Sequence, residues 1–174
     1  SDLITNALAH GLAQCGIASL RVDKRGVGSS EGDFLSSGLS TFVDDGLCWL
    51  QVLSHSSDTD SEGLFIIGHS EGALIAPQLA QQFPKLAGMV LLCPTIEEPS
   101  ALLLRQAELW RTSLHEQSWF RRPLEKLIAL VFDPIKAMQK LMAQTRAGTQ
   151  GSSRFWLRKL PLAWLQDYLT QDPP

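Results

Sequence analysis

A serine in a glycine-flanked pentapeptide is the strongest chemical signal in this chain. Residues 68–72, Gly-His-Ser-Glu-Gly, have the pattern Gly-x-Ser-x-Gly. The apolar run Leu64–Ile67 before it is typical of a strand buried on both faces, and the run after it has helical periodicity. A serine on such a tight strand-to-helix turn has an exposed hydroxyl, which is the geometry of a nucleophile elbow. We therefore predict that Ser70 is a nucleophile, and that Gly68 and Gly72 are small because the two backbones pass close together.

A second copy of the same pattern lies in residues 28–32, Gly-Ser-Ser-Glu-Gly, and its surroundings differ. The charged loop Asp23–Gly26 precedes it, and Asp33–Gly38, which does not resemble a helix start, follows it. A nucleophile elbow needs a strand before the serine and a helix after it. We therefore do not expect Ser30 to be a nucleophile.

Composition describes an ordinary globular domain. The chain has 174 residues, of which 44% are hydrophobic and 19% charged, with a net charge of −3. This charge gives no electrostatic reason to expect nucleic acid or anionic membranes as partners. No apolar run is long enough to span a bilayer, and no metal-ligand pattern is present. The chain begins with Ser1 rather than Met, so its true start, and any targeting signal there, is expected to lie upstream.

Three cysteines, Cys15, Cys48 and Cys93, are odd in number and form no Cys-x-x-Cys pair. We expect buried free thiols, and with them a reducing compartment such as the cytoplasm.

Helical and strand patterns alternate in the first half of the chain. This alternation predicts an α/β fold, with a parallel sheet covered by helices on both faces. Pro77 falls inside one predicted helix, where proline removes a hydrogen bond and should produce a kink. The predicted elements are the helix ending at Gly16, the strand Ile17–Asp23, the helix Leu39–Leu53, the strand Leu64–Ile67, the helix Ser70–Phe83 and the strand Leu86–Cys93.

The glycine-rich loop Lys24–Ser30 is a poor candidate for a nucleotide site. It contains no Gly-Lys-[Ser/Thr], and Gly26-x-Gly28 lacks the third glycine of a dinucleotide motif. We expect no nucleotide or other cofactor.

Beyond Pro94 the pattern becomes almost wholly helical. We therefore predict two regions, a core in residues 1–94 and a helical cap in residues 95–174. Within the cap, Leu127–Phe132 is strand-like and Gly148–Ser153 is linker-like. The predicted cap helices are Ala101–Leu114, Trp119–Val131, Pro134–Ala147 and Leu160–Leu169.

Two motifs carry a family resemblance. Residues Phe65–Ala73 resemble the elbow of bacterial serine hydrolases of the α/β-hydrolase superfamily, in the branch with small-ester esterases and serine-aminopeptidase-like proteins. Residues Asp23–Ser30 are similar to the loop after the fourth strand of that family, which borders the active site. The resemblance covers Ser1–Pro94 and implies a partial α/β-hydrolase fold with a helical cap inserted after the sixth strand.

The resemblance implies hydrolysis of a small carboxylic ester without a cofactor or metal. Ser70 Oγ would attack the carbonyl, a histidine would take its proton, and the Glu71 N–H would donate to the oxyanion. Arg25, Gly26 and His69 are candidates to line the substrate pocket. The oligomeric state is not predicted.

The chain departs from this family in its catalytic acid and base. The family order is Ser, then Asp or Glu, then His. Asp133 follows a strand-like run and so imitates the acid, but no histidine follows it; the histidines are His10, His55, His69 and His115. The first oxyanion-hole loop is also absent, and by resemblance the third strand would precede Ser1. We therefore expect an internal fragment of a serine hydrolase that is inactive alone.

Two other interpretations stay open. One is a non-catalytic binding module that keeps the fold and has lost the triad. The other is an acyltransferase or amidase on the same fold, because a fold does not determine the reaction.

Overall fold

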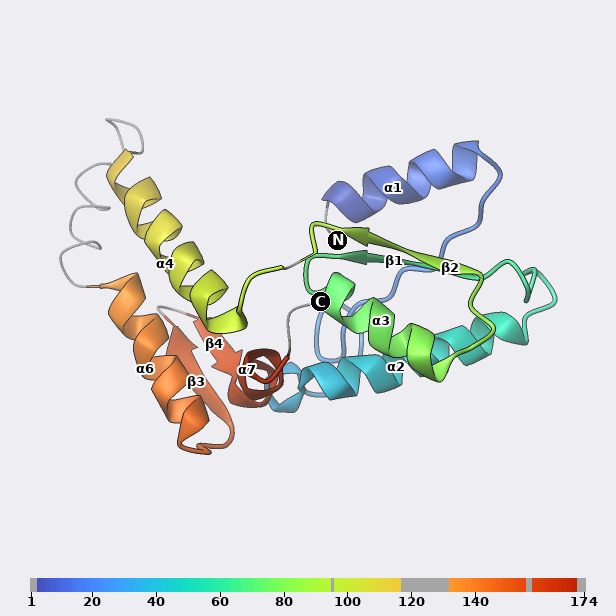
Figure 1. Cartoon of the computed structure of the whole chain (residues 1–174). Helices are drawn as coiled ribbons and strands as arrows, with labels where there is room; N and C mark the ends of the chain where they lie inside the picture. Colours follow the sequence, from blue (N-terminus) through green and yellow to red (C-terminus); the bar gives the residue numbers. More distant parts are fainter. Residues whose placement is uncertain (1–2, 95, 117–131, 156–157, 172–174) are drawn as a thin grey trace.

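The computed structural model describes residues 3–94, 96–116, 132–155 and 158–171. Within the described residues, two α-helices, a short 3₁₀ helix and a strand–helix–strand unit occupy the first half of the chain, and helices with one antiparallel strand pair occupy the second (Figure 1). The elements are α1 (Leu3–Gln14), the short 3₁₀ helix η1 (Phe34–Ser36), α2 (Leu39–Ser54), β1 (Phe65–His69), α3 (Gly72–Gln82), β2 (Gly88–Leu92), α4 (Pro99–Glu116), α6 (Pro134–Arg146), β3 (Ser152–Phe155), β4 (Arg158–Pro161) and α7 (Leu162–Leu169).

The strands on either side of α3 pair in parallel, as the sequence predicts. Phe65 is opposite Gly88 and His69 is opposite Leu92, so β1 and β2 end at the same edge. Helices α2 and α3 lie on one side of this strand pair and α1 lies on the other (Figure 1). The carboxyl ends of both strands, where Ser70 follows β1, therefore meet at one edge of the sheet.

The predicted burial of β1 on both faces is wrong. Phe65 is 65% exposed and Ile67 is 40% exposed, whereas Gly68 is buried. Within the described residues β1 pairs only with β2, and α1 contains no buried residue. A strand is buried on both faces only when other elements pack against each face, and here one face of β1 is open.

The predicted strand Ile17–Asp23 is also wrong, since the segment forms no strand. Its apolar side chains stay exposed, with Ile17 at 52% and Leu20 at 47%. A strand is defined by its ladder, and no described segment pairs with these residues. Local β-propensity is therefore not enough to form the strand here.

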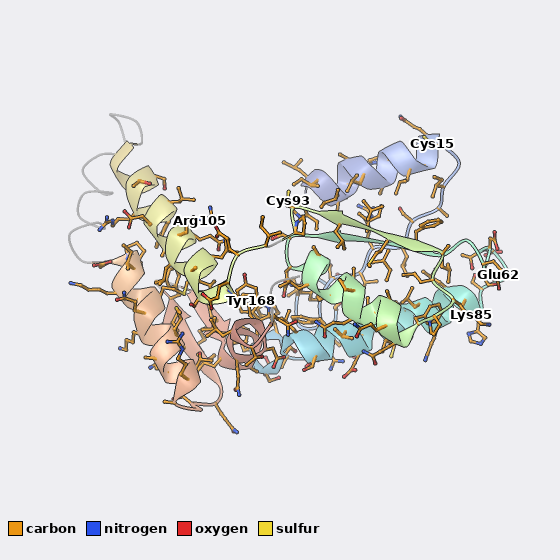
Figure 2. All side chains as sticks on the ribbon, viewed as in Figure 1. Cys15, Glu62, Lys85, Cys93, Arg105 and Tyr168 are labelled. Carbon is orange, nitrogen blue, oxygen red and sulfur yellow. The ribbon has the colours of Figure 1, made fainter. Side chains whose placement is uncertain are left out.

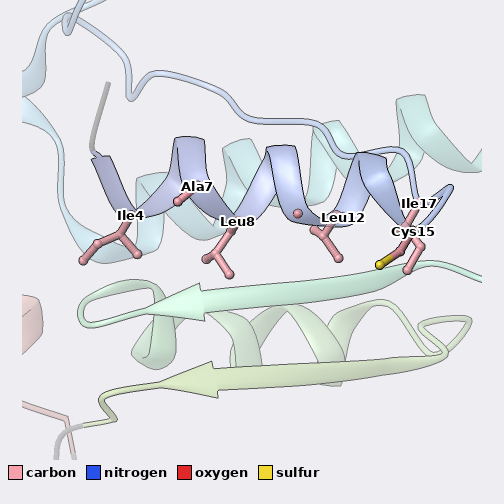
Figure 3. A pocket seen from close by; sticks show the side chains of 7 residues that line it. Ile4, Ala7, Leu8, Leu12, Cys15 and Ile17 are labelled. Atoms are coloured by element: carbon pink, nitrogen blue, oxygen red, sulfur yellow. The ribbon is translucent and has the colours of Figure 1, made fainter.

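Helix α1 turns an incompletely packed apolar stripe toward the strands. Gly16, at φ +76°, ends the helix as predicted, and the Ile17 N–H donates to the Leu12 carbonyl at 2.9 Å. The side chains of Ile4, Leu8 and Leu12 point toward the strand pair and line a cavity of about 580 Å³ (Figure 3). The apolar face of α1 is thus separated from the sheet by unfilled space.

A small core fixes α3 against α2. It consists of buried Val43, Leu50 and Leu79, and Ile66 of β1 packs against it. Gly46 lets the helices approach, because a Cβ there would lie 2.8 Å from a methyl carbon of Leu79. The predicted helix Leu39–Leu53 is confirmed as α2, and α3 continues through Pro77. This packing holds the helix that follows Ser70.

A second core joins α4, α6 and α7 to the start of α2. Helices α4 and α6 confirm two of the predicted cap helices, while the predicted helix Trp119–Val131 and most of the strand-like run Leu127–Phe132 lie outside the described residues. The antiparallel pair β3–β4 was not predicted, and it takes the first two residues of the predicted helix Leu160–Leu169. The core residues are Leu39, Leu103, Ala107, Met138, Leu141, Met142, Leu162, Leu165 and Tyr168.

The expectation of buried thiols is wrong, because Cys15, Cys48 and Cys93 are all exposed. Among the helices of the described ranges, none is long and apolar enough to cross a membrane.

We predict that the open edge of β1 makes this chain self-associate. A free strand edge with apolar side chains is a template for pairing with a second chain, and a lysine on such a strand opposes it. The variant Phe65→Lys should shift the chain toward monomer in light scattering after size-exclusion chromatography. The control is Val52→Lys, where the side chain is 57% exposed and lies on helix α2 rather than on the edge of the strand. A chain that is monomeric at every concentration would contradict this prediction.

Candidate functional site

Ser70 occupies a strained turn between β1 and α3. Its φ is +54°, in the left-handed region that non-glycine residues rarely adopt, and its side chain is exposed. Its N–H donates to the Leu92 carbonyl at 2.9 Å, and its own carbonyl accepts from the Ala73 N–H at 2.9 Å. These bonds tie the turn to the end of β2 and to the first turn of α3. The predicted nucleophile-elbow geometry is therefore present at Ser70.

Gly68 is the residue that makes this turn sterically possible. A Cβ at Gly68 would lie 2.3 Å from the Gly72 carbonyl oxygen and 2.9 Å from the Ala73 nitrogen, which real Cβ atoms do not tolerate. The close approach of the strand and helix backbones that the sequence predicts is thus confirmed at Gly68. The same prediction for Gly72 is wrong, because a Cβ at Gly72 would meet no atom within 4 Å.

A cavity opens in front of Ser70. Its volume is about 410 Å³, and Cys93, which follows β2 and has φ +52°, lies beside Ser70 in its wall. The two non-glycine residues with positive φ in the described part of the chain thus directly follow the paired strands. Helix α4 faces them across the cavity, as the positions of Cys93 and Arg105 in Figure 2 show. The lining residues are Ser70, Cys93, Pro94, Ile96, Glu97, Leu102, Arg105 and Gln106.

The start of α4 is stabilised by an acidic side chain. Glu98 accepts hydrogen bonds from Ser100 Oγ at 2.5 Å, from the Ser100 N–H at 3.1 Å and from the Ala101 N–H at 2.8 Å. These bonds lower the pKa of Glu98, the Ser100 side-chain bond most. Because the folded pKa is lowered, this stabilisation is present at neutral pH and is lost as the pH falls through that pKa.

Glu71, directly after Ser70, contributes a backbone N–H and a carboxylate to this region. Its backbone N–H makes no hydrogen bond within the described residues, and its role as an oxyanion donor stays a prediction. Its carboxylate forms an ion pair with Lys24 and accepts from Trp164 Nε1 at 2.5 Å. Lys24 also lies 4.7 Å from the centre of the Phe42 ring. One side chain therefore joins the elbow to the loop after residue 23 and to α7.

The loop that contains Arg25 and Gly26 is built as a tight structural turn. Arg25 makes a bidentate pair with Asp45 on α2, with Nε to Oδ2 at 2.8 Å, and this bond raises the pKa of Arg25. Gly26 has φ +71°, and a Cβ there would lie 2.5 Å from the Phe34 nitrogen. Neither residue lines the cavity at Ser70, and neither does His69, the other predicted pocket residue. Through Lys24 the loop nevertheless borders the elbow.

Ser30 is in a different setting. Its Oγ donates to the Asp23 carbonyl at 2.8 Å, inside a turn with no strand before it or helix directly after it.

The described residues place no histidine at Ser70 as a hydrogen-bonding partner. His10 lies on α1, and Nδ1 of His55, at the end of α2, is 2.7 Å from the Gln51 carbonyl. The side chain of His115 lies outside the described residues. Asp133 is the N-cap of α6 and accepts a hydrogen bond from the Ile135 N–H at 3.0 Å. This capping role explains why an aspartate follows the strand-like run, and no catalytic role is needed. Within the described ranges no group of three His, Cys, Asp or Glu side chains could hold a metal ion.

The comparisons with known proteins agree with this geometry. A family model described as serine aminopeptidase, S33 (Hydrolase_4) matches residues 3–160. The chain belongs to this α/β-hydrolase family. The predicted partial α/β-hydrolase fold is thereby confirmed. The match also extends far beyond Pro94, into the region where the sequence offered only a helical pattern.

One curated relative is similar over part of the chain. It is an uncharacterized protein of Rickettsia prowazekii (strain Madrid E), 34% identical over 87 residues, which are 49% of this chain and 34% of the relative. The chain therefore spans about a third of the length of the curated relative that it matches. No solved structure matches the chain significantly.

The residues of α4 that line the cavity at Ser70 were not identified from the sequence. Leu102, Arg105 and Gln106 follow the i, i+3, i+4 spacing of one helix face, so a shared face was predictable. Which face of α4 points at Ser70 depends on packing against α6 and α7, and no local pattern contains that information.

We predict that Gly68→Ala lowers the free energy of unfolding by about 2–4 kcal/mol, since the added methyl group meets backbone atoms that cannot move aside. Gly72→Ala is the matched control, with an expected change within about 1 kcal/mol because its Cβ enters open space. Urea denaturation measures both. Equal effects of the two substitutions would show that backbone contact at Gly68 does not constrain the turn.

We also predict that Glu71→Ala lowers the free energy of unfolding by about 1–2 kcal/mol, because it leaves Trp164 Nε1 and Lys24 without their acceptor; the partial exposure of the pair keeps the loss moderate. The control is Glu108→Ala, which removes an exposed pair with Arg111 inside α4 and should change little. A change in tryptophan fluorescence should accompany only the first variant. Identical effects would contradict a role of Glu71 in joining the segments.

Proposed function

We propose that the protein is a serine hydrolase that cleaves small carboxylic esters, with Ser70 as the nucleophile. The observation that carries the proposal is the left-handed backbone of Ser70 at the end of β1, with its side chain at a cavity of about 410 Å³. Strain of this kind is found at functional sites, where the surrounding structure holds it in place. Family membership supports hydrolysis in general.

In the proposed reaction Ser70 Oγ attacks the carbonyl carbon of the ester and forms a tetrahedral intermediate. The Glu71 N–H, which lacks a partner among the described residues, donates to the oxyanion. Collapse of the intermediate releases the alcohol and leaves an acyl group on Ser70, which water then removes. The base that takes the Ser70 proton is assigned to residues outside those that the structure describes.

Amide cleavage is a second candidate, favoured by the description of the family as serine aminopeptidases. It would use the same nucleophile and the same oxyanion donor, with an amine as leaving group. The cavity wall contains both apolar and charged side chains, so its composition accommodates either leaving group.

Labelling by a fluorophosphonate probe tests the role of Ser70. We expect the full-length gene product to be labelled at Ser70, and the 174-residue chain alone to remain unlabelled. Ser70→Ala should abolish labelling and lower kcat for p-nitrophenyl butyrate by about 10⁴-fold or more. Ser30→Ala, in the other Gly-x-Ser-x-Gly sequence, is the matched control and should keep full labelling.

The outcomes separate the alternatives. Absence of labelling in the full-length product would favour a binding module. Labelling together with faster cleavage of p-nitroanilides than of esters would favour the amidase. Labelling that persists in Ser70→Ala would overturn the assignment of the nucleophile.

A further inference from the structure

The cavity in front of Ser70 contains a pair of opposite charges. Arg105 Nε donates to Glu97 Oε2 at 3.0 Å, and both residues belong to the cavity wall opposite the elbow. The side chains are 53% and 44% exposed, so the pair borders the open space of the cavity. An exposed ion pair of this kind contributes little to stability, and its position at the site needs another explanation.

Helix α4 directs Arg105 into the cavity. Leu102, Arg105 and Gln106 share one face of the helix, and all three line the cavity. The neighbouring face of α4 is held by Leu103 and Ala107, which are buried in the core with α6 and α7. The orientation of Arg105 is thus set by a packed helix.

Arg105 has unused donor capacity at this position. A guanidinium has five N–H donors in a planar fork, and Arg105 uses only Nε within the described residues. The two terminal amino groups are left, and they match the two oxygens of a carboxylate. Glu97 occupies the Nε side of the fork and so holds it in one orientation. The Gln106 amide beside Arg105 also makes no hydrogen bond within the described residues and adds a further donor.

We propose that Arg105 binds a carboxylate in the substrate, so that the preferred substrates have an acyl chain ending in an anionic group. Glu97 is a positioning residue in this arrangement, since it orients the guanidinium without contacting the carboxylate. The cavity of about 410 Å³ has room for a small acyl group together with its carboxylate. The inference rests on the proposed function for the role of Ser70 as the attacking group, but carboxylate binding does not depend on turnover.

Binding of three small amides to the 174-residue chain tests the proposal without catalysis. Succinamate has a terminal carboxylate, butyramide a methyl group, and 4-aminobutyramide an ammonium group. Dissociation constants come from ligand-observed NMR titrations. We expect succinamate to bind about tenfold more tightly than butyramide. Arg105→Gln should remove this preference, while Arg111→Gln, which breaks an ion pair on α4 outside the cavity, should keep it.

Equal binding of succinamate and butyramide, or a preference that persists in Arg105→Gln, would overturn the proposal. Tightest binding of 4-aminobutyramide, lost in Glu97→Gln, would also overturn it and assign the site to cations. The result is distinguishable from failure of the proposed function. A carboxylate preference in the 174-residue chain, together with absence of fluorophosphonate labelling in the full-length product, would support anion binding while removing the hydrolase assignment.

Discussion

The close contact between the backbones of β1 and α3 is the constraint on which the rest of the site depends. With no side chain at Gly68, the Gly72 carbonyl occupies the space that a Cβ would take. The chain must then reverse direction within Ser70 and Glu71, and Ser70 adopts φ +54° to do so. The same turn exposes the serine side chain and leaves the Glu71 N–H without a partner among the described residues. The proposed nucleophile and the proposed oxyanion donor are thus two consequences of one steric requirement.

The Glu71 carboxylate extends this local constraint across the molecule. It lies at the start of α3, where negative charge is favourable, and it binds Lys24 and Trp164, residues far apart in sequence. Trp164 in turn stacks on Tyr168, a member of the second core. The elbow is therefore connected by direct contacts to the loop before η1 and to the helices that carry the other wall of the cavity.

The sheet around the elbow is small, and its exposed edge has a clear physical origin. β1 pairs with β2 alone among the described segments, and Ile17–Asp23 forms no ladder. Exposed Phe65 and the apolar face of α1 consequently border open space rather than packed side chains. The site itself is less affected, since it is built at the carboxyl edge of the strand pair, by residues that follow β1 and β2 and by α4.

Much of the architecture follows from patterns that act over a few residues. The helices α1, α2, α3, α4 and α6, the parallel pair β1–β2 and the elbow at Ser70 were all predictable, because apolar periodicity and glycine spacing act locally. The predicted strand Ile17–Asp23 was wrong because a strand exists only with a neighbour. The predicted burial of β1 and of the three cysteines was wrong for a related reason, because burial depends on which elements of the fold cover a residue. The partners of Glu71 and the cavity wall formed by Glu97 and Arg105 were decided by tertiary structure alone. They join segments separated by tens of residues, and only the packing of α4 and α7 determines which of their faces meet Ser70.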